Sequence, residues 1–180
     1  MGISIRGSGD SGARAASSST PTDPDMADSL VDYAQFLETV RRDYDRAEEM
    51  YKRAVEADPK YARSLGNYAR FLKNARRDYD RAEEMYKRAL ETDPNHAINL
   101  GNYAWFLQYA RRDYDRAEEM YKRAVEADPN NAINLGNYAW FLQDVRRDSD
   151  GAEEMYKRAV EADPNNANSL GNYADFLETV

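Results

Sequence analysis

The side chains that could carry out acid–base or metal chemistry are mostly carboxylates. The chain of 180 residues contains 33 Asp and Glu residues, a single His and no Cys. The carboxylates recur at helix-surface spacing in every copy of a repeat, which is typical of a solvated face. His96 stands at one junction between helical segments, where we expect a solvent-exposed helix-start residue rather than a catalyst or metal ligand. Metal-ligand spacing, a phosphate-binding glycine loop and a nucleophile–base set are absent from the sequence, so we predict no enzyme and no cofactor.

Noncovalent binding is the remaining class of chemistry. Trp105 and Trp140 occur in the segments NYAWFLQYA and NYAWFLQDV, on the side of each helical segment opposite its leucines. The overall charge limits the partner, because a net charge of −8 repels phosphate backbones and argues against nucleic acid. We therefore expect a protein or peptide partner.

These residues belong to a repeat with a period of 35 residues. Residues 41–75, 76–110, 111–145 and 146–180 align without gaps, and residues 28–40 supply a further half-unit. Apolar periodicity predicts two helical segments in each unit, which we name A and B in chain order. The sequence thus predicts an all-α array of nine helices over residues 28–180: four antiparallel helix pairs followed by a lone C-terminal A helix.

The B segments read DYDRAEEMYKRAV or a close variant. Ala82, Met85, Tyr86 and Ala89 form the apolar stripe of one copy. Asp80 followed by Glu83 predicts an N-cap with a capping box, and three further pairs repeat it: Asp45/Glu48, Asp115/Glu118 and Asp150/Glu153. At the end of the same segment, Asp93 is expected to cap the next helix, with Pro94 at its first position.

The A segments read AINLGNYAWFLQYA in one copy. Leu100, Tyr103, Ala104 and Leu107 follow the spacing of one helical core stripe. An Arg-Arg pair follows each of the first four A segments, where positive charge suits the C-terminus of a helix. The short stretch between A and B predicts antiparallel neighbours.

Each unit resembles a tetratricopeptide repeat. The family pattern Ala-x3-aromatic-x2-Ala-x4-Pro corresponds to Ala82, Tyr86, Ala89 and Pro94, and it recurs in three further copies: Ala47/Tyr51/Ala54/Pro59, Ala117/Tyr121/Ala124/Pro129 and Ala152/Tyr156/Ala159/Pro164. The resemblance implies a right-handed superhelical solenoid whose A helices line a concave, ligand-binding surface. The period is 35 rather than the 34 of the family, and we place the extra residue in the loop between A and B. A 35-residue helical repeat also describes the RNA-binding pentatricopeptide family, but that family is typically basic and lacks this series of Ala, aromatic, Ala and Pro. The YAxF and YKRA segments also resemble those of the half-a-TPR family of RNA-processing scaffolds.

At about 100° per residue, each A segment presents a second face opposite its core stripe. This face differs most between units. From the first unit to the fifth it runs acidic, basic, aromatic, aromatic and acidic, beginning with Asp28, Asp32, Gln35 and Glu38 and ending with Asn168, Asn172, Asp175 and Glu178. We predict that a ligand-binding groove is formed by Arg63, Asn67, Arg70, Lys73, Ile98, Asn102, Trp105, Gln108, Tyr109, Ile133, Asn137, Trp140 and Gln143.

Three alternatives stay open on this face. Gly66, Gly101 and Gly136 allow close approach, either of a ligand or of a neighbouring helix. Trp105 and Trp140 either face the groove or pack on one another and on adjacent A helices. The ladder of Asn67, Asn102, Asn137 and Asn172 either binds a peptide backbone or links the helices by hydrogen bonds.

The leading hypothesis is a scaffold that binds a peptide with an apolar anchor over Trp105 and Trp140 and an acidic stretch near Arg63, Arg70 and Lys73. A structural protein that self-associates through its C-terminal helix is the second hypothesis, and RNA association is the third. The family's two-carboxylate clamp for chaperone tails is not expected. Asn67 matches its middle Asn, but Val31 and Gln35 replace the Lys and Asn of its first helix.

Residues 1–27 are rich in Gly, Ser, Pro and Asp and predict a disordered tail. The tail has no apolar core of a secretory signal, whereas Arg6, Arg14 and its serines weakly resemble an organelle-targeting segment. No apolar run approaches the roughly 18 residues of a membrane span. These features favour an intracellular soluble protein and leave the compartment open.

Overall fold

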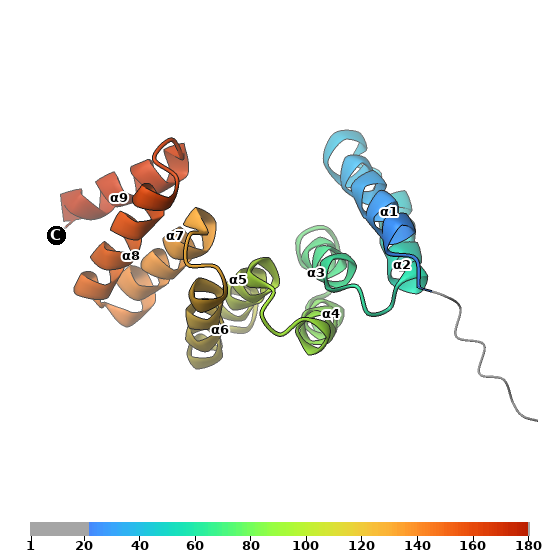
Figure 1. The fold of residues 1–180 in the computed structure, drawn as a ribbon, viewed down its shortest axis with the longest axis horizontal. Helices are drawn as coiled ribbons and strands as arrows, with labels where there is room; N and C mark the ends of the chain where they lie inside the picture. Colours follow the sequence, from blue (N-terminus) through green and yellow to red (C-terminus); the bar gives the residue numbers. More distant parts are fainter. Residues whose placement is uncertain (1–21, 180) are drawn as a thin grey trace, which may run out of the picture.

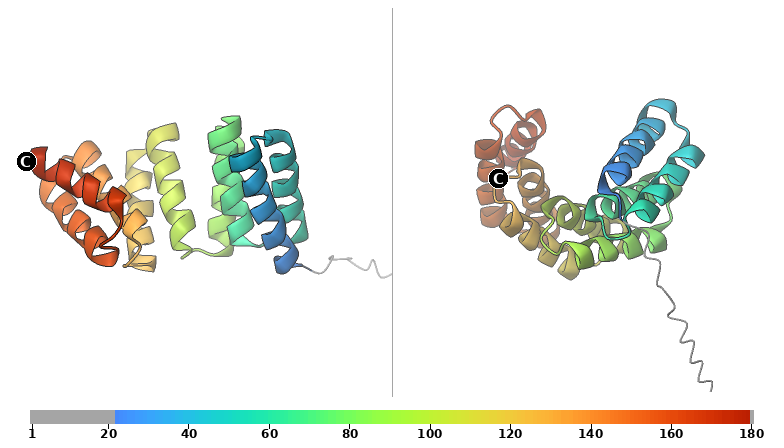
Figure 2. Two further views of the ribbon diagram at one scale, coloured as in Figure 1. Left: turned by 90° about the horizontal axis from the view of Figure 1, so that it is seen from above. Right: turned by 45° about the vertical axis from the view of Figure 1, so that its right-hand side comes forward.

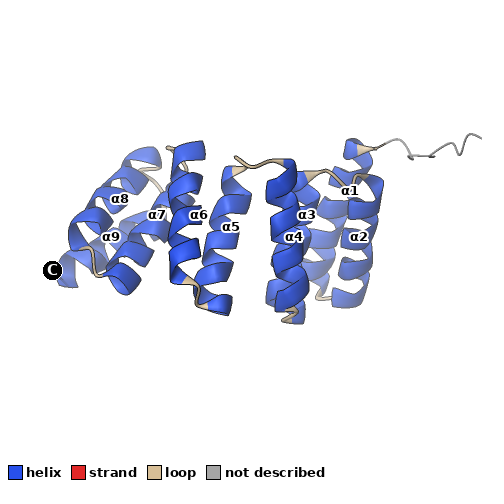
Figure 3. Ribbon diagram, turned by 90° about the horizontal axis from the view of Figure 1, so that it is seen from below, coloured by secondary structure: helices blue, strands red, loops and turns tan. Residues whose placement is uncertain are grey.

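A computed structural model describes residues 22–179 of the chain, and every regular element in this range is helical (Figure 3). The A helices are α1 (Pro24–Phe36), α3 (Ala62–Phe71), α5 (Ala97–Phe106), α7 (Ala132–Phe141) and α9 (Ala167–Thr179). The B helices are α2 (Tyr44–Ala57), α4 (Tyr79–Thr92), α6 (Tyr114–Ala127) and α8 (Ser149–Ala162). The predicted array of nine helices is confirmed over this range. None of these helices has the length and apolar character needed to cross a membrane.

Successive helix pairs form an arc that runs from α1 and α2 to α9 (Figures 1 and 2). Each of the first four A helices packs along the B helix that follows it and also contacts the next A helix. Neighbouring B helices approach one another much less closely. The A helices therefore line the inner, concave side of the arc, as the repeat pattern predicts.

The first four A helices each continue into a π-helical turn: η1 (Leu37–Arg41), η2 (Leu72–Arg76), η3 (Leu107–Arg111) and η4 (Leu142–Arg146). A π-helical turn takes one more residue than an α-helical turn because its hydrogen bonds join residues five apart. The extra residue of the 35-residue unit lies in this turn, and our placement of it in the A–B loop was wrong. The next residue, such as Arg112 with φ 56°, is left-handed and reverses the chain.

The B helices begin two residues earlier than the sequence pattern predicts. The side chain of Asp78 accepts a hydrogen bond from the amide of Arg81, which makes Asp78 the N-cap of α4. Asp43, Asp113 and Asp148 cap the other three B helices in the same way. The predicted N-cap at Asp80 and its capping box with Glu83 are therefore wrong.

Asp80 and Glu83 instead hold an arginine of the next A–B connection. The Nε of Arg111 donates to Glu83 at 2.8 Å, and its Nη2 donates to Asp80 at 2.7 Å. The guanidinium of Arg111 also lies over the ring of Phe106, 5.5 Å from its centroid. Equivalent contacts are made by Arg76 with Asp45 and Glu48, and by Arg146 with Asp115 and Glu118. The first Arg of the last three pairs thus links successive units.

The B–A junction also differs from the prediction. Asp93 is the C-cap of α4, and its carboxylate accepts from the amide of Asn95 in a turn that contains Pro94. The N-cap of α5 is His96, whose Nδ1 accepts from the amide of Asn99 at 3.3 Å. The single His of the chain therefore does begin a helix, as we expected, although it is half-buried rather than fully exposed.

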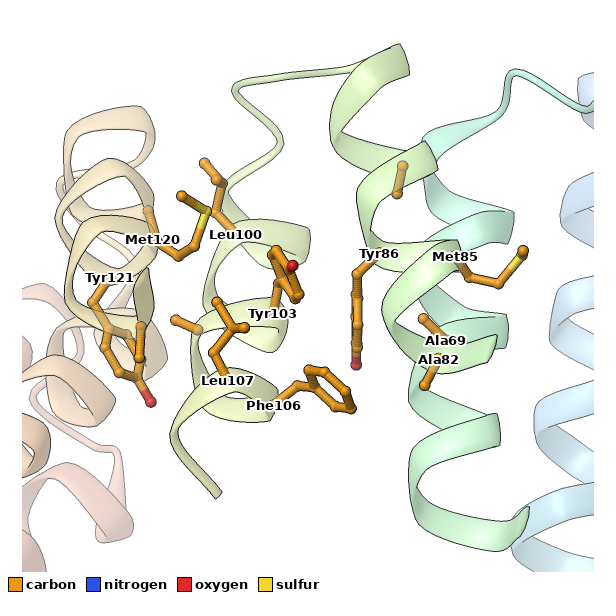
Figure 4. Packing of buried hydrophobic residues seen from close by; sticks show 14 of the residues in the cluster. Ala69, Ala82, Met85, Tyr86, Leu100, Tyr103, Phe106, Leu107, Met120 and Tyr121 are labelled. Atoms are coloured by element: carbon orange, nitrogen blue, oxygen red, sulfur yellow. The ribbon is translucent and has the colours of Figure 1, made fainter. Parts of the chain in front are cut away.

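The inner A helices α3, α5 and α7 are each buried on two faces. Leu100 and Leu107 pack against the following B helix, and both are fully buried, as the core stripe predicts. Tyr103 and Phe106 face the preceding B helix, where the ring centroids of Tyr86 and Phe106 lie 5.7 Å apart (Figure 4). The second buried face around Phe106 was missed by the single-stripe reading. It explains how an A helix holds two B helices together.

At the N-terminal end, α1 begins at Pro24, four residues before the boundary expected at residue 28. Asp23 caps it by accepting from the amide of Met26. The tail predicted for residues 1–27 otherwise lies mostly outside the described residues.

Candidate functional site

The glycines of the A helices make room for an asparagine of the next A helix. A Cβ atom built on Gly66 would overlap the side-chain oxygen of Asn99, and one built on Gly101 would overlap that of Asn134. Asn99 is buried and donates its Nδ2 to the carbonyl of Ala62 at 2.9 Å. Of the two alternatives for Gly66 and Gly101, the structure therefore supports close packing of helices.

The last such junction is looser. Ser169 of α9 occupies the position of Asn99 and Asn134, and a Cβ on Gly136 would meet no atom within 4 Å. A pocket of about 280 Å³ lies here, lined in part by Ile133, Gly136 and Asn137. At the first junction the larger residue lies on the first helix. α1 carries Val31 where the other A helices carry Gly, and α3 carries the smaller Ser64 at the position of Asn99 and Asn134.

The two arginines predicted for the groove are already paired within the chain. Arg63 contacts the carboxylate of Asp28, and its Nη2 lies 2.9 Å from that of Asp32. Arg70 Nη2 lies 3.3 Å from Glu38 Oε2. The acidic first unit and the basic second unit therefore neutralise one another across α1 and α3. At this end of the groove, the change from acidic to basic residues along the sequence therefore reflects ion pairs within the chain.

An uninterrupted row of side chains crosses the middle of the concave face. Trp105 and Tyr109 have ring centroids 4.2 Å apart, and Tyr109 and Trp140 have centroids 5.7 Å apart. The ammonium of Lys73 lies 3.9 Å from the centroid of Trp105. Trp105 and Tyr109 remain 36% and 44% exposed. We call Trp105, Tyr109 and Trp140 the aromatic row. These residues pack together and still present a surface, so both alternatives for the tryptophans hold in part.

Gln108 and Gln143 do not face the groove in the expected way. Gln108 is buried and accepts a hydrogen bond from the hydroxyl of Tyr121 at 2.8 Å. Gln143 is half-buried and accepts from Tyr156 at 3.0 Å. Both side chains therefore satisfy a tyrosine of the following B helix, and the expectation that Gln108 lines the groove is corrected.

Lys73 occupies the equivalent position in the second unit, and its neighbour Tyr86 has a buried hydroxyl with no hydrogen-bond partner among residues 22–179. Burial, with the nearby charges of Arg70 and Arg77, lowers the pKa of Lys73 to about 8. Burial also raises the pKa of Tyr86 above its usual range. In the second unit the hydroxyl of Tyr86 therefore lacks a hydrogen bond, while the side chain of Lys73 lies on the ring of Trp105.

The asparagine ladder divides into two parts. Asn67 accepts from Gln35 Nε2 at 2.7 Å and donates to the carbonyl of Arg63, so it links helices. Asn102, Asn137 and Asn172 form no hydrogen bond with any described residue through their side chains, and only Asn172 is fully exposed. These three amides have the capacity to bind a peptide backbone.

Two isoleucines extend the apolar surface beyond the aromatic row. Ile98 is 57% exposed and Ile133 is 68% exposed, each at the start of its A helix. Ile98 lines a pocket of about 270 Å³ together with Asn67 and Asn102. Ile98, Ile133, Trp105 and Tyr109 are thus all exposed on A helices or on the turns that continue them.

The C-terminal end of the face is acidic. Asp144, Asp175 and Glu178 are exposed, and none forms an ion pair with the part of the chain that the structure describes. Burial, followed by the charge of Asp144, raises the pKa of the Tyr109 hydroxyl to about 12. The negative charge of Asp144 therefore disfavours ionisation of Tyr109, one residue of the aromatic row. Among the described residues, no cluster of three potential metal ligands is present.

Comparisons with known proteins agree with this architecture. Models of the tetratricopeptide repeat match residues 41–96, 73–132 and 106–167, which together span most of the chain. A comparison with curated proteins gives no match.

Several solved structures share the fold. PilF from Pseudomonas aeruginosa is 22% identical, with a TM-score of 0.74, over 86% of this chain and 69% of that chain. PilW, a type IV pilus biogenesis factor, is 21% identical, with a TM-score of 0.71, over 84% of this chain and 74% of that chain. The first repeat domain of Spaghetti (RPAP3), bound to the HSP90 peptide SRMEEVD, is 19% identical, with a TM-score of 0.60, over 69% of this chain and 97% of that chain.

Proposed function

The chain belongs to the tetratricopeptide repeat family, and from this premise we propose that it is a non-catalytic scaffold that binds a peptide segment of a partner protein in its concave groove. The observation that carries the proposal is the aromatic row. Its rings pack against one another in tilted pairs across two successive units, and Trp105 and Tyr109 remain partly exposed. Aromatic side chains supply a large contact area with little loss of side-chain freedom, which makes them frequent anchors for binding.

The surroundings of the row suit a peptide. Ile98 and Ile133 are exposed on the same face and offer apolar contacts on either side of it. Asn102 and Asn137 offer amide groups that can pair with a peptide backbone. A solved relative with a peptide bound supports this mode of use for the fold.

The proposal is tested by selecting peptides from a random displayed library with the full chain. Affinities of the enriched peptides are then measured for the wild type and for the double variant Trp105→Ala/Trp140→Ala. We expect the double variant to lose at least about tenfold in affinity, which corresponds to about 1.4 kcal/mol. Its helical content should be unchanged by circular dichroism.

Tyr114→Ala is the matched control, because Tyr114 is also an exposed aromatic residue, 40% accessible, but begins the outer helix α6. It should bind the enriched peptides as the wild type does. The groove is not the binding site if the double Trp variant retains full affinity, or if Tyr114→Ala loses as much.

Self-association is the second candidate function, favoured by the exposed face of α9. Leu170 and Leu177 of this helix are 45% and 51% exposed, at positions where Leu100 and Leu107 are buried by a B helix. Light scattering over a concentration series separates the candidates. A dimer that is abolished by Leu170→Lys/Leu177→Lys supports assembly, and a monomer throughout argues against it.

A further inference from the structure

The charges on the concave face are unequally available to a partner. Arg63 is held by acids of α1, and Arg70 is held by Glu38 of η1. Asp144, Asp175 and Glu178 at the other end are exposed and unpaired within residues 22–179. The free charge of the groove is therefore negative around α7 and α9, in contrast to the basic second unit that the sequence alone suggests.

The middle of the groove already contains an example of cation binding. The ammonium of Lys73 lies 3.9 Å from the centroid of Trp105, close enough for a favourable contact with the face of the indole. This lysine comes from η2 of the preceding unit, one A helix away from Trp105. The A–A geometry of this repeat thus places a positive charge on a tryptophan face.

Trp140 has the same position in the next unit but lacks its cation. The counterpart of Lys73 is Gln108, which turns inward and accepts from Tyr121. Tyr109 packs against Trp140, which is half-buried. The place that an ammonium takes on Trp105 is therefore not taken by a cation of this chain on Trp140.

By the repeat, two carboxylates follow Trp140 along the array toward α9. Asp144 follows Gln143 in η4 at the position that Tyr109 has in η3, so it lies between the aromatic row and α9. Asp175 in α9 is the counterpart of Trp140 in α7, and its charge reaches Tyr156, whose pKa burial and Asp175 raise to about 12. By the repeat, Asp144 and Asp175 are therefore neighbours in the way that Tyr109 and Trp140 are.

We infer that the partner peptide is basic, and that it places a Lys or Arg side chain on the face of Trp140, between the carboxylates of Asp144 and Asp175. The inference rests on the proposed peptide-binding function and names the chemistry of its partner. Apolar residues next to this side chain contact Ile133 and Tyr109. An acidic peptide would have to displace Asp28, Asp32 or Glu38 from their arginines, and at the other end it would meet like charge.

The library selection described above also tests this inference. We expect the peptides whose binding depends on Trp105 and Trp140 to be enriched in Lys and Arg relative to the unselected library. Enrichment of acidic or uncharged peptides that still depend on the tryptophans overturns the inference and leaves the proposed function intact. Failure to enrich any groove-dependent peptide overturns both.

Charge-neutral variants then locate the cation. Asp144→Asn/Asp175→Asn should lower the affinity for an enriched basic peptide by about tenfold. This loss of affinity should be smaller at high salt because the two carboxylates are exposed. Glu126→Gln/Glu161→Gln is the matched control, since it removes two exposed acids from the outer helices α6 and α8. If both double variants weaken binding equally, the effect is one of net charge, and the specific contact at Trp140 is refuted.

Discussion

The ammonium of Lys73 lies 3.9 Å from the centroid of the Trp105 ring, on the next A helix of the array. In three units, a side-chain oxygen at the position of Lys73 accepts a hydrogen bond from a buried tyrosine: Glu38 from Tyr51, Gln108 from Tyr121 and Gln143 from Tyr156. In the second unit the lysine lies on the tryptophan, and the hydroxyl of Tyr86 has no acceptor within residues 22–179. The second unit thus lacks the hydrogen bond to its buried tyrosine and has instead the contact between Lys73 and Trp105 in the groove.

Lys73→Gln should restore the missing hydrogen bond. We expect this variant to be more stable than Lys73→Met by about 1 kcal/mol, the usual net contribution of one hydrogen bond. Both substitutions remove the charge, so the difference in the free energy of unfolding, measured in urea, isolates the bond to Tyr86. Equal stability of the two variants would show that the glutamine does not reach the hydroxyl.

The stability of the protein should depend on pH through the same lysine. Its pKa is lowered to about 8 in the folded protein, from an ordinary value of 10.5. Between these values the unfolded chain holds more protons than the folded chain, so the free energy of unfolding rises with pH. The unfavourable effect of the charge is complete below about pH 8.

Urea unfolding of wild type and Lys73→Met at pH 7.5 and 9.5 measures this dependence. We expect the wild type to gain stability relative to the variant at the higher pH. Tyr68 and Tyr103, whose pKa values are raised to about 12, act above this window and equally in both proteins. A difference that does not change with pH would contradict the prediction.

Alanine at two equivalent glycines should have opposite effects. Gly66→Ala places a methyl group against Asn99 and should cost about 1–3 kcal/mol, as overpacking does. Gly136→Ala meets open space and should stabilise its helix by about 1 kcal/mol. Asn99→Ser should reduce the cost of Gly66→Ala, because Ser169 is the natural partner of Gly136. Thermal unfolding of the four variants checks the order, and equal effects at both glycines would refute the packing account.

Glu83 should matter to stability far more than its neighbour Glu84. Glu83 accepts from Arg111 and Lys87, whereas Glu84 is exposed and forms no ion pair in the described part of the chain. Glu83→Gln should cost about 1.5–3 kcal/mol, the range for hydrogen bonds to charged groups, and Glu84→Gln close to nothing. Chemical denaturation measures both. Similar small losses of stability in both variants would mean that the contact between Glu83 and Arg111 contributes little to the free energy of unfolding.

The acidic peptide SRMEEVD, which a structural relative binds, should not bind this chain. Arg63 and Arg70 are already paired with acids of α1 and η1, and Val31 is buried rather than presented to the groove. Fluorescence polarisation with a labelled peptide tests this, and the RPAP3 domain serves as the positive control. Saturable binding that Arg70→Ala abolishes would show that these arginines are available after all.

The repeat and its core were predictable because helical periodicity is a local property. Leu100, Tyr103, Ala104 and Leu107 are buried as the pattern requires. The caps were misplaced by two residues because Asp78 and Asp80 both precede a plausible first turn. Only the fold brings Arg111 to Glu83, 28 positions earlier in the chain, and so removes Glu83 from the capping role.

The exposed face of the A segments was predictable up to the end of each α-helix. Ile98 and Trp105 lie where a wheel of about 100° per residue puts them. Gln108 lies within the π-helical turn η3, where the wider turn changes the angle per residue and the wheel no longer applies. Ion pairs between units could not be predicted from the sequence either. Arg63 and Arg70 look like unpaired basic residues until the fold brings the acids of the first unit beside them.

The pairing of a glycine with an asparagine across neighbouring A helices also bears on how the number of units can change. Removing residues 76–110 would bring Gly66 opposite Asn134, which is the same kind of pair that it had with Asn99. Removing residues 41–75 would bring Val31 opposite Asn99, where a branched side chain meets an amide that needs a glycine. Internal units of this protein are thus interchangeable modules whose loss or duplication leaves the new contact sterically sound, while the first junction resists such shortening.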